Sequence, residues 1–168
     1  MKTLEFVVPC YNEEAVLNIF YDTVSPILNS LDGIKASFIF VDDGSRDNTV
    51  NIIRQLAERD KTVKYISFSR NFGKESAMLA GLKMSSADYV GIIDADLQHS
   101  PELIPEMVKS VNEEGYDIAA ARRTDRKGEA KLKSAFSRSF YKLINRISDA
   151  NIAYSALCDI IRGMSANY

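Results

Sequence analysis

Short apolar runs alternate with longer amphipathic stretches through most of the chain. This succession is typical of βαβ units, in which helices cover both faces of a mostly parallel sheet. Each short run is brief and mostly apolar, as a strand covered on both faces should be, so strands are expected at residues 4–8, 38–41, 63–68, 89–93 and 117–121. Helices are expected at residues 13–31, 49–59, 74–84 and 101–114. The pattern predicts an α/β fold with a mostly parallel sheet and helices on both faces.

Length and composition favour one globular domain. The chain has 168 residues, of which 46% are hydrophobic and 26% charged. No apolar run approaches the roughly 18 residues that cross a bilayer, and the first residues become polar too early for a signal peptide. Cys10 and Cys158 are too few for a disulfide framework, and the single histidine leaves no Cys/His cluster for zinc. We therefore expect a single cytoplasmic domain over residues 1–168.

The loops that follow the strands are the places to look for a ligand site, because an open parallel sheet binds ligands at the carboxyl ends of its strands. The first strand leads into PCYNEE, where a dinucleotide-binding fold would have GxGxxG. Pro9, Tyr11 and Glu13 offer instead a rigid turn, an aromatic face and an acceptor, which suit a base and a ribose. An ordinary strand-to-helix turn is the alternative for this loop taken alone.

Acidic residues end the second strand, in the segment VDDGSRDNT. Asp42 is expected to be partly buried on the strand and to need hydrogen-bond donors, which the N–H groups of a nucleobase could supply. Asp43 followed by Gly44 is typical turn chemistry and needs no function. After the third strand, SFSRNFGKES places Arg70, Asn71 and Lys74 around Phe72 and Gly73. This loop could contact ribose or phosphate, or it could be a helix start with exposed charge.

The fourth strand carries the sharpest signal, because YVGII leads directly into DADLQ. Asp94 and Asp96 are two residues apart on an extended chain and should point the same way. Mg²⁺ is typically held by one or two carboxylates plus substrate phosphates, which suits this acidic pair. We therefore predict a Mg²⁺ or Mn²⁺ site that bridges a diphosphate, with a capped and solvated turn as the alternative.

Basic residues are concentrated late in the chain. Residues 122–146 hold nine lysines and arginines against two acidic residues, a local charge of +7 in a chain of net charge −2. A helix expected at residues 130–147 would place these cations around one apolar stripe. The segment could meet an anion or an anionic membrane surface, or it could be the solvated face of a helix.

Four segments taken in order resemble the successive nucleotide-sugar-binding segments of family 2 glycosyltransferases, which have the Rossmann-like GT-A fold. They are VVPCYNEE, FVDDGSRDNT, SRNFGKESAMLAGL and DADLQHSPELIPEM, and the likeness covers residues 6–149. DADLQ before a Pro-Glu helix start is most similar to the polyprenyl-phosphate and dolichyl-phosphate sugar synthase branch. The resemblance implies an inverting enzyme that moves a sugar from a UDP- or GDP-sugar to a polyprenyl phosphate.

The resemblance also implies roles for particular residues. Nucleoside contacts fall at Pro9, Tyr11, Glu13 and Asp42, with Asn71 and Gly73 as further candidates for the nucleotide, and metal ligands fall at Asp94, Asp96 and Gln98. Arg122 and Arg138 join the acidic pair as catalytic residues, because arginines neutralise the charge that develops on a leaving diphosphate. The implied partners are a nucleotide-sugar donor and a lipid phosphate at the inner face of the membrane, with no nucleic acid.

The end of the chain departs from the family after about residue 149, where NIAYSALCDIIRGMSANY replaces the expected acceptor-site segment. The acceptor region is therefore predicted to be truncated or divergent. Two other functions stay open: a catalytically incomplete nucleotide-binding domain, and a family 2 transferase that uses a saccharide acceptor in cell-surface polysaccharide synthesis. A phosphoryl-transfer protein is disfavoured, because receiver domains and haloacid-dehalogenase-like phosphatases carry their acidic residues on early strands.

Overall fold

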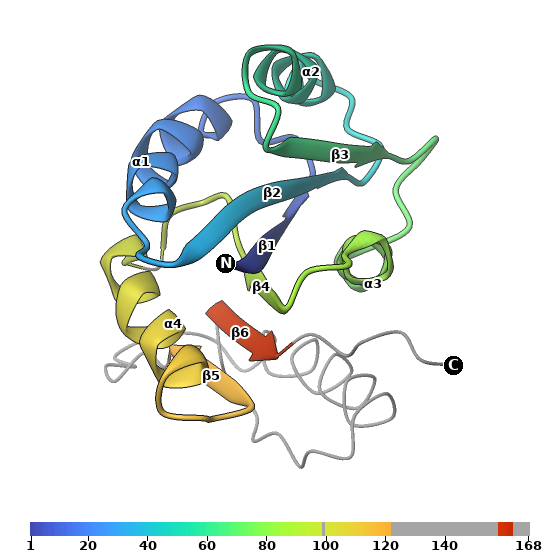
Figure 1. Cartoon of the computed structure of the whole chain (residues 1–168). Helices are drawn as coiled ribbons and strands as arrows, with labels where there is room; N and C mark the ends of the chain where they lie inside the picture. The colour runs from blue at the N-terminus through green and yellow to red at the C-terminus, as the bar shows by residue number, and fades with distance from the viewer. Residues whose placement is uncertain (99, 122–157, 163–168) are drawn as a thin grey trace, which may run out of the picture.

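A computed structural model describes residues 1–98, 100–121 and 158–162, which form one sheet with helices on both faces (Figure 1). The described strands lie in the order β3-β2-β1-β4-β6-β5. Their bounds are β1 Lys2–Cys10, β2 Ile34–Asp42, β3 Val63–Ser67, β4 Tyr89–Ile93, β5 Ile118–Ala121 and β6 Cys158–Arg162. β1 pairs in parallel with β2 and β4, and β2 with β3, whereas β6 is antiparallel to both of its neighbours. The predicted α/β class and mostly parallel sheet are confirmed.

The helices follow the strands in the predicted alternation. They are α1 Leu17–Asn29, α2 Thr49–Arg59, α3 Lys74–Met84 and α4 Ile104–Asn112, with a short 3₁₀ turn η1 at Pro101–Leu103. α1 begins at Leu17 rather than at residue 13, because Asn12 has a left-handed φ of 57° and the Val16 amide closes a turn on the Glu13 carbonyl. The loop after β1 is therefore longer than predicted.

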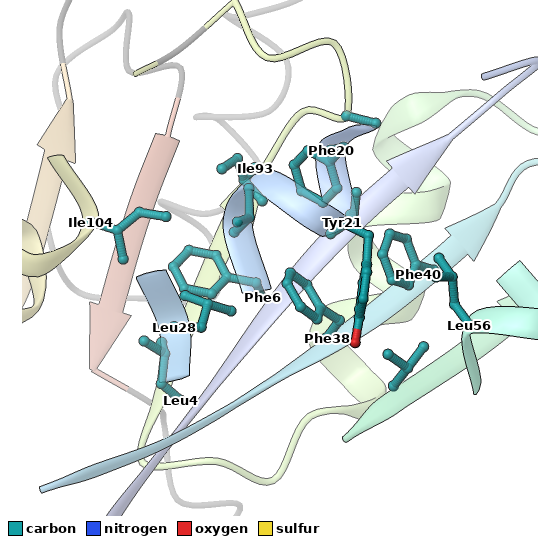
Figure 2. Packing of buried hydrophobic residues seen from close by; sticks show 14 of the residues in the cluster. Leu4, Phe6, Phe20, Tyr21, Leu28, Phe38, Phe40, Leu56, Ile93 and Ile104 are labelled. Carbon is teal, nitrogen blue, oxygen red and sulfur yellow. The ribbon is translucent and has the colours of Figure 1, made fainter. Parts of the chain in front are cut away.

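One face of the sheet carries the larger core. Successive strand residues point to opposite faces, and Phe38 and Phe40 of β2 both point toward α1. Their ring centroids are 5.5 Å apart, and Phe20 of α1 meets both rings edge-on (Figure 2). Phe6 of β1 and Ile93 of β4 extend this buried cluster toward α4, so α1, α2 and α4 share one layer.

The opposite face is covered by α3. Val7, Val41 and Ile92 of the three central strands pack with Ala77 and Met78 of this helix. The helix comes closest at Gly81, where a β-carbon would stand 2.3 Å from Val7 Cγ1. Because Gly81 has no side chain, α3 lies directly on β1 and begins near the carboxyl edge of the sheet.

The antiparallel strand β6 is the element that the sequence analysis did not predict. Its residues pair with Tyr89–Ile93 on one side and with Ile118–Ala121 on the other. The helix predicted at residues 130–147 and the basic segment 122–146 lie outside the described residues. In the part of the chain that the structure describes, no helix is both long enough and apolar enough to cross a membrane.

Candidate active site

The order of the strands reverses between β1 and β4. β1 leads to β2 and β3 on one side, whereas β4 lies on the other side of β1. In open α/β sheets, ligands bind outside the strand ends at such a switch point. A cleft of about 330 Å³ opens there, lined by Pro9, Cys10, Tyr11, Glu13, Asp43, Asn71, Gly73, Lys74, Ala77, Asp94, Ala95 and Asp96.

Most of the predicted site residues line this one cleft. They come from three segments that are distant in sequence: Pro9, Tyr11 and Glu13 from the end of β1 and its loop, Asn71 and Gly73 from the loop before α3, and Asp94 and Asp96 from the loop after β4. Tyr11 is 42% exposed, so part of its ring is available for stacking. The expectation that the two β4 aspartates point toward a common space agrees with their shared place in the lining.

Asp94 forms an ion pair with Lys74, the first residue of α3. The Lys74 Nζ lies 2.6 Å from Asp94 Oδ1 and 2.7 Å from Oδ2, so the ammonium contacts both oxygens. Val90 and Ile92 of β4 face α3, and Asp94 continues this alternation toward the start of the helix. Asp96 is exposed, and its Oδ1 accepts a hydrogen bond from the Gln98 amide at 3.0 Å.

Negative charge predominates in the cleft. Among the described residues that line it, Glu13, Asp43, Asp94 and Asp96 are acidic and Lys74 is the only cation. Burial raises the pKa of Glu13 above its ordinary value, and the carboxylates of Asp96 and Asp94 raise it further, with Lys74 partly offsetting them. A diphosphate would be repelled by this charge unless a cation accompanied it.

The two aspartates at the end of β2 have the reverse of the expected arrangement. Asp42 is 2% exposed and does not line the cleft. Its Oδ1 accepts the Ser45 amide at 3.1 Å, and its Oδ2 accepts the Ser67 hydroxyl at 2.9 Å. These protein groups supply the donors that we expected from a nucleobase. Because a carboxylate oxygen can accept a second hydrogen bond, the nucleoside contact of Asp42 stays a prediction.

Asp43, which we expected to be a turn residue without function, holds the loop before α3. Its Oδ1 accepts the Phe72 amide at 2.7 Å and its Oδ2 accepts the Gly73 amide at 2.9 Å. Strand alternation could have indicated this contact, because Ile39 and Val41 face α3 and Asp43 continues on the same side. The carboxylate thus positions the loop that brings Asn71 and Gly73 to the cleft.

The remaining predicted residues are not part of the described lining. Gln98 is exposed and is absent from the lining. Arg122 and Arg138 lie outside the described residues. Sequence reasoning placed Lys74 in a loop that could contact ribose or phosphate, but it did not predict the ion pair with Asp94. It did not select Asp43 as a site residue, because the contacts of Asp43 are with a segment far along the chain.

The donor set of the cleft fits a hard divalent cation. In the described ranges, no three histidine, cysteine or acidic side chains form a complete metal cage. Asp94 and Asp96 nevertheless supply carboxylate oxygens to one cleft. Mg²⁺ and similar ions are commonly held by one or two carboxylates together with substrate phosphates, so this pair fits a metal that shares its ligands with a diphosphate.

Cys10 contributes little reactivity to the cleft. Its side chain is 1% exposed, and its Sγ donates to the Val8 carbonyl at 3.4 Å. Burial raises the pKa of this thiol well above its ordinary value, and the negative charges of Glu13 and Asp42 add to the effect. A thiol kept protonated is a poor nucleophile and a poor metal ligand. The chemistry of the described cleft therefore depends on its carboxylates and on Lys74.

The strand order, the switch point beside β1 and the acidic pair after β4 define the class of GT-A domains. Residues 5–167 match the family described as "Glycosyl transferase family 2", and the chain belongs to this family. The family that the four sequence motifs indicated is thereby confirmed.

Two similar relatives come from the polyprenyl-phosphate branch. The chain is 42% identical over 149 residues to the bactoprenol glucosyl transferase of Shigella phage SfV, a match that covers 89% of this chain and 48% of that protein. It is 41% identical, with the same coverage, to the prophage bactoprenol glucosyl transferase homolog of Escherichia coli. The chain thus spans about half the length of the curated relatives it matches.

A solved structure shares the fold. The mannosyltransferase PcManGT from Pyrobaculum calidifontis, in complex with GDP-Man and Mn²⁺, gives a TM-score of 0.62 at 18% sequence identity. The match covers 95% of this chain and 44% of that chain. At this level of identity the likeness establishes the GT-A fold and nothing finer.

Proposed function

We propose that this chain is a glycosyltransferase domain that moves a hexose from a UDP- or GDP-sugar to a polyprenyl phosphate, with inversion at the anomeric carbon. The observation that carries the proposal is the meeting of Tyr11, Asn71 and the Asp94–Asp96 pair in one cleft of a family 2 chain. The names of the two similar relatives favour glucose as the sugar and bactoprenol phosphate as the acceptor.

The donor would lie across the cleft. Tyr11 offers a partly exposed ring for the base, and Asn71 and Gly73 lie where ribose or phosphate oxygens need polar partners. Asp94 and Asp96 would hold Mg²⁺ or Mn²⁺, with Gln98 as a further candidate ligand. When bound, the metal would stabilise the negative charge that develops on the leaving diphosphate.

The chain's own cations would share that task. Lys74 lies beside Asp94 and could reach a diphosphate in the same cleft. Arg122 and Arg138 are the other candidates, and each would stabilise the departing phosphates in the same electrostatic way. The basic segment that contains both arginines would also favour a membrane surface, where the lipid acceptor resides.

The nature of the acceptor decides whether a general base is needed. A phosphate monoester has a second pKa of about 6, so a polyprenyl phosphate is already an anionic nucleophile at neutral pH. Its oxygen could attack the anomeric carbon as the bond to the diphosphate breaks, with no proton to remove. An alcohol acceptor would instead need a carboxylate within hydrogen-bond reach.

A transfer assay tests the proposal. The chain is incubated with radiolabelled UDP-glucose or GDP-mannose and undecaprenyl phosphate in detergent micelles with Mg²⁺, and label is sought in the lipid fraction. We expect label in the lipid, a β-linked product from the α-linked donor, and loss of both in Asp94→Asn. Transfer to a saccharide but not to the lipid would favour the polysaccharide alternative. Donor binding without any transfer would favour an incomplete nucleotide-binding domain.

A further inference from the structure

The ion pair between Lys74 and Asp94 occupies the oxygens that a metal would need. Both carboxylate oxygens of Asp94 lie within 2.7 Å of the lysine Nζ. Asp94 is one of only two carboxylates that follow β4 into the described cleft, the other being Asp96. The ammonium therefore occupies one of the two carboxylates that are candidates to bind the metal.

The same ammonium is free to move. The Lys74 side chain is 54% exposed, and it ends in a point charge on a flexible four-carbon stem. The backbone beneath it is fixed, because Asp43 binds the Phe72 and Gly73 amides just before the helix and Gly81 seats the helix on Val7. A conformational change on ligand binding is therefore expected in the Lys74 side chain and not in the backbone of α3.

We propose that Lys74 is the counter-ion that keeps Asp94 from holding a divalent cation until the donor's diphosphate enters the cleft. This inference rests on the proposed function, since it needs a metal and a diphosphate in that cleft. The ammonium contacts both oxygens of Asp94, and a metal at either oxygen would be repelled by this nearby positive charge, so the lysine and the metal compete for Asp94. A diphosphate offers the ammonium other anionic oxygens, and lysine is a common phosphate ligand.

The consequence is cooperative binding. A nucleotide that attracts Lys74 leaves Asp94 available, so it strengthens metal binding beyond the effect of its own phosphate oxygens. Linkage requires the metal to strengthen nucleotide binding by the same factor. The free protein would bind a divalent cation weakly, and the donor and the metal would occupy the cleft together.

The experiment compares Mn²⁺ binding to the unsubstituted chain, to Lys74→Met and to Lys83→Met, with and without UDP. Bound Mn²⁺ is measured from the loss of the electron paramagnetic resonance signal of the free ion, so no activity is required. Methionine keeps the length of the lysine stem and removes its charge. Lys83 lies in the last turn of the same helix, is exposed and does not line the cleft, so it controls for net charge.

Without UDP, we expect Lys74→Met to bind Mn²⁺ about tenfold more tightly than the unsubstituted chain, the effect of removing one competing charge near the surface. Lys83→Met should match the unsubstituted chain. The strengthening of Mn²⁺ binding by UDP should be smaller in Lys74→Met than in the other two proteins.

Equal Mn²⁺ affinity of Lys74→Met and the unsubstituted chain without UDP would overturn the inference and leave the proposed function standing, provided that UDP still strengthens Mn²⁺ binding. Failure of all three proteins to bind Mn²⁺ even with UDP would overturn both the inference and the metal site on which it rests.

Discussion

The backbone of Gly44 lies directly against that of Arg70. A β-carbon added at Gly44 would stand 2.3 Å from the Arg70 carbonyl carbon and 2.7 Å from the Asn71 amide nitrogen. Gly44 also has a φ of +68°, in the left-handed region that favours glycine. Through this contact, the turn after β2 sets the position of the loop that carries Asn71 and Gly73 to the cleft.

Gly44→Ala should therefore lower the free energy of unfolding by roughly 2–5 kcal/mol, combining left-handed strain with a backbone overlap. Gly33→Ala is the matched control, because Gly33 has a similar φ of +70° with nothing within 4 Å of the added carbon. It should cost only about 1–2 kcal/mol. Urea denaturation measures both, and equal losses would show that the contact with Arg70 relaxes without cost.

Asp43→Asn should weaken nucleotide binding although Asp43 is held by the protein itself. The two amides bind different oxygens of Asp43, so an asparagine would place its NH2 group, a donor, against either the Phe72 or the Gly73 amide. That backbone donor would lose its acceptor, at a cost of about 1–3 kcal/mol. The loop should shift, and the affinity for UDP with Mn²⁺ should fall in calorimetry. Asp60→Asn is the control, because Asp60 also accepts several hydrogen bonds but does not line the cleft. It should lose stability and keep its UDP affinity. A variant at Asp43 with unchanged affinity would contradict the positioning role.

Asp96→Ala should abolish the stabilisation that metal and nucleotide give together. Thermal unfolding is recorded with UDP and GDP separately, each with and without Mn²⁺. Ligand at 100 times its Kd adds roughly 2.7 kcal/mol, which is a shift of about 5–10 °C for a domain of this size. The unsubstituted chain and Asp22→Asn, a surface control on α1, should show this shift with one nucleotide plus metal. A full shift in Asp96→Ala would remove Asp96 from the metal site.

Glu5 should make the fold sensitive to acid. It is 5% exposed, and its oxygens accept from Lys64 Nζ and Ser85 Oγ, both at 2.6 Å. Burial by itself would raise its pKa, but these hydrogen bonds and the lysine charge outweigh it, so the pKa of Glu5 is lowered. The unfolded chain therefore binds the proton more readily. This contribution to stability is complete above the unfolded pKa of about 4.3 and is lost as pH falls through the folded pKa.

Glu5→Gln should accordingly be less stable than the unsubstituted chain at pH 7, by about 1–3 kcal/mol for the weakened charged hydrogen bonds. Its stability should also fall less steeply between pH 5 and pH 3 in urea denaturation. Glu106→Gln, on the exposed side of α4, should follow the unsubstituted chain in both respects. An unchanged pH dependence in Glu5→Gln would mean that other carboxylates dominate the acid response.

Local sequence patterns were sufficient for most elements of the fold. α2, α3 and β4 begin and end where the sequence predicts. α2 has a clear helical periodicity, β4 is a short continuous apolar run, and α3 begins directly after Gly73. α1 was predicted too long, since Glu13 and Glu14 are compatible with a helix, whereas residues 14–16 form a turn closed by the Val16 amide on the Glu13 carbonyl before the helix begins at Leu17. β6 could not be predicted, because CDIIR has too few residues to show a period and its pairing with β4 is entirely non-local.

The acidic pair after β4 was identified from sequence because its two members are close together and leave one strand. The contacts of Asp43 and Lys74 were not, since each depends on a segment at least twenty residues away. The choice between Asp42 and Asp43 depends on which face of β2 lies against α3, and the structure shows that Ile39 and Val41 are on that face. Carrying the alternation of β2 two residues further would have placed Asp43, and not Asp42, on the side of α3.

The place of β6 between β4 and β5 has a consequence for synthesis of the protein. Strands β1 to β4 leave the ribosome long before residues 158–162, yet β6 alone joins β4 to β5 among the described strands. Until β6 emerges, the outer edge of β4 presents unpaired backbone groups, a ready template for pairing with another nascent chain. Asp94 and Asp96 lie in the loop that directly follows β4, the strand at this unpaired edge. The described cleft therefore lies beside a fully paired β4 only when the last of these strands has been made.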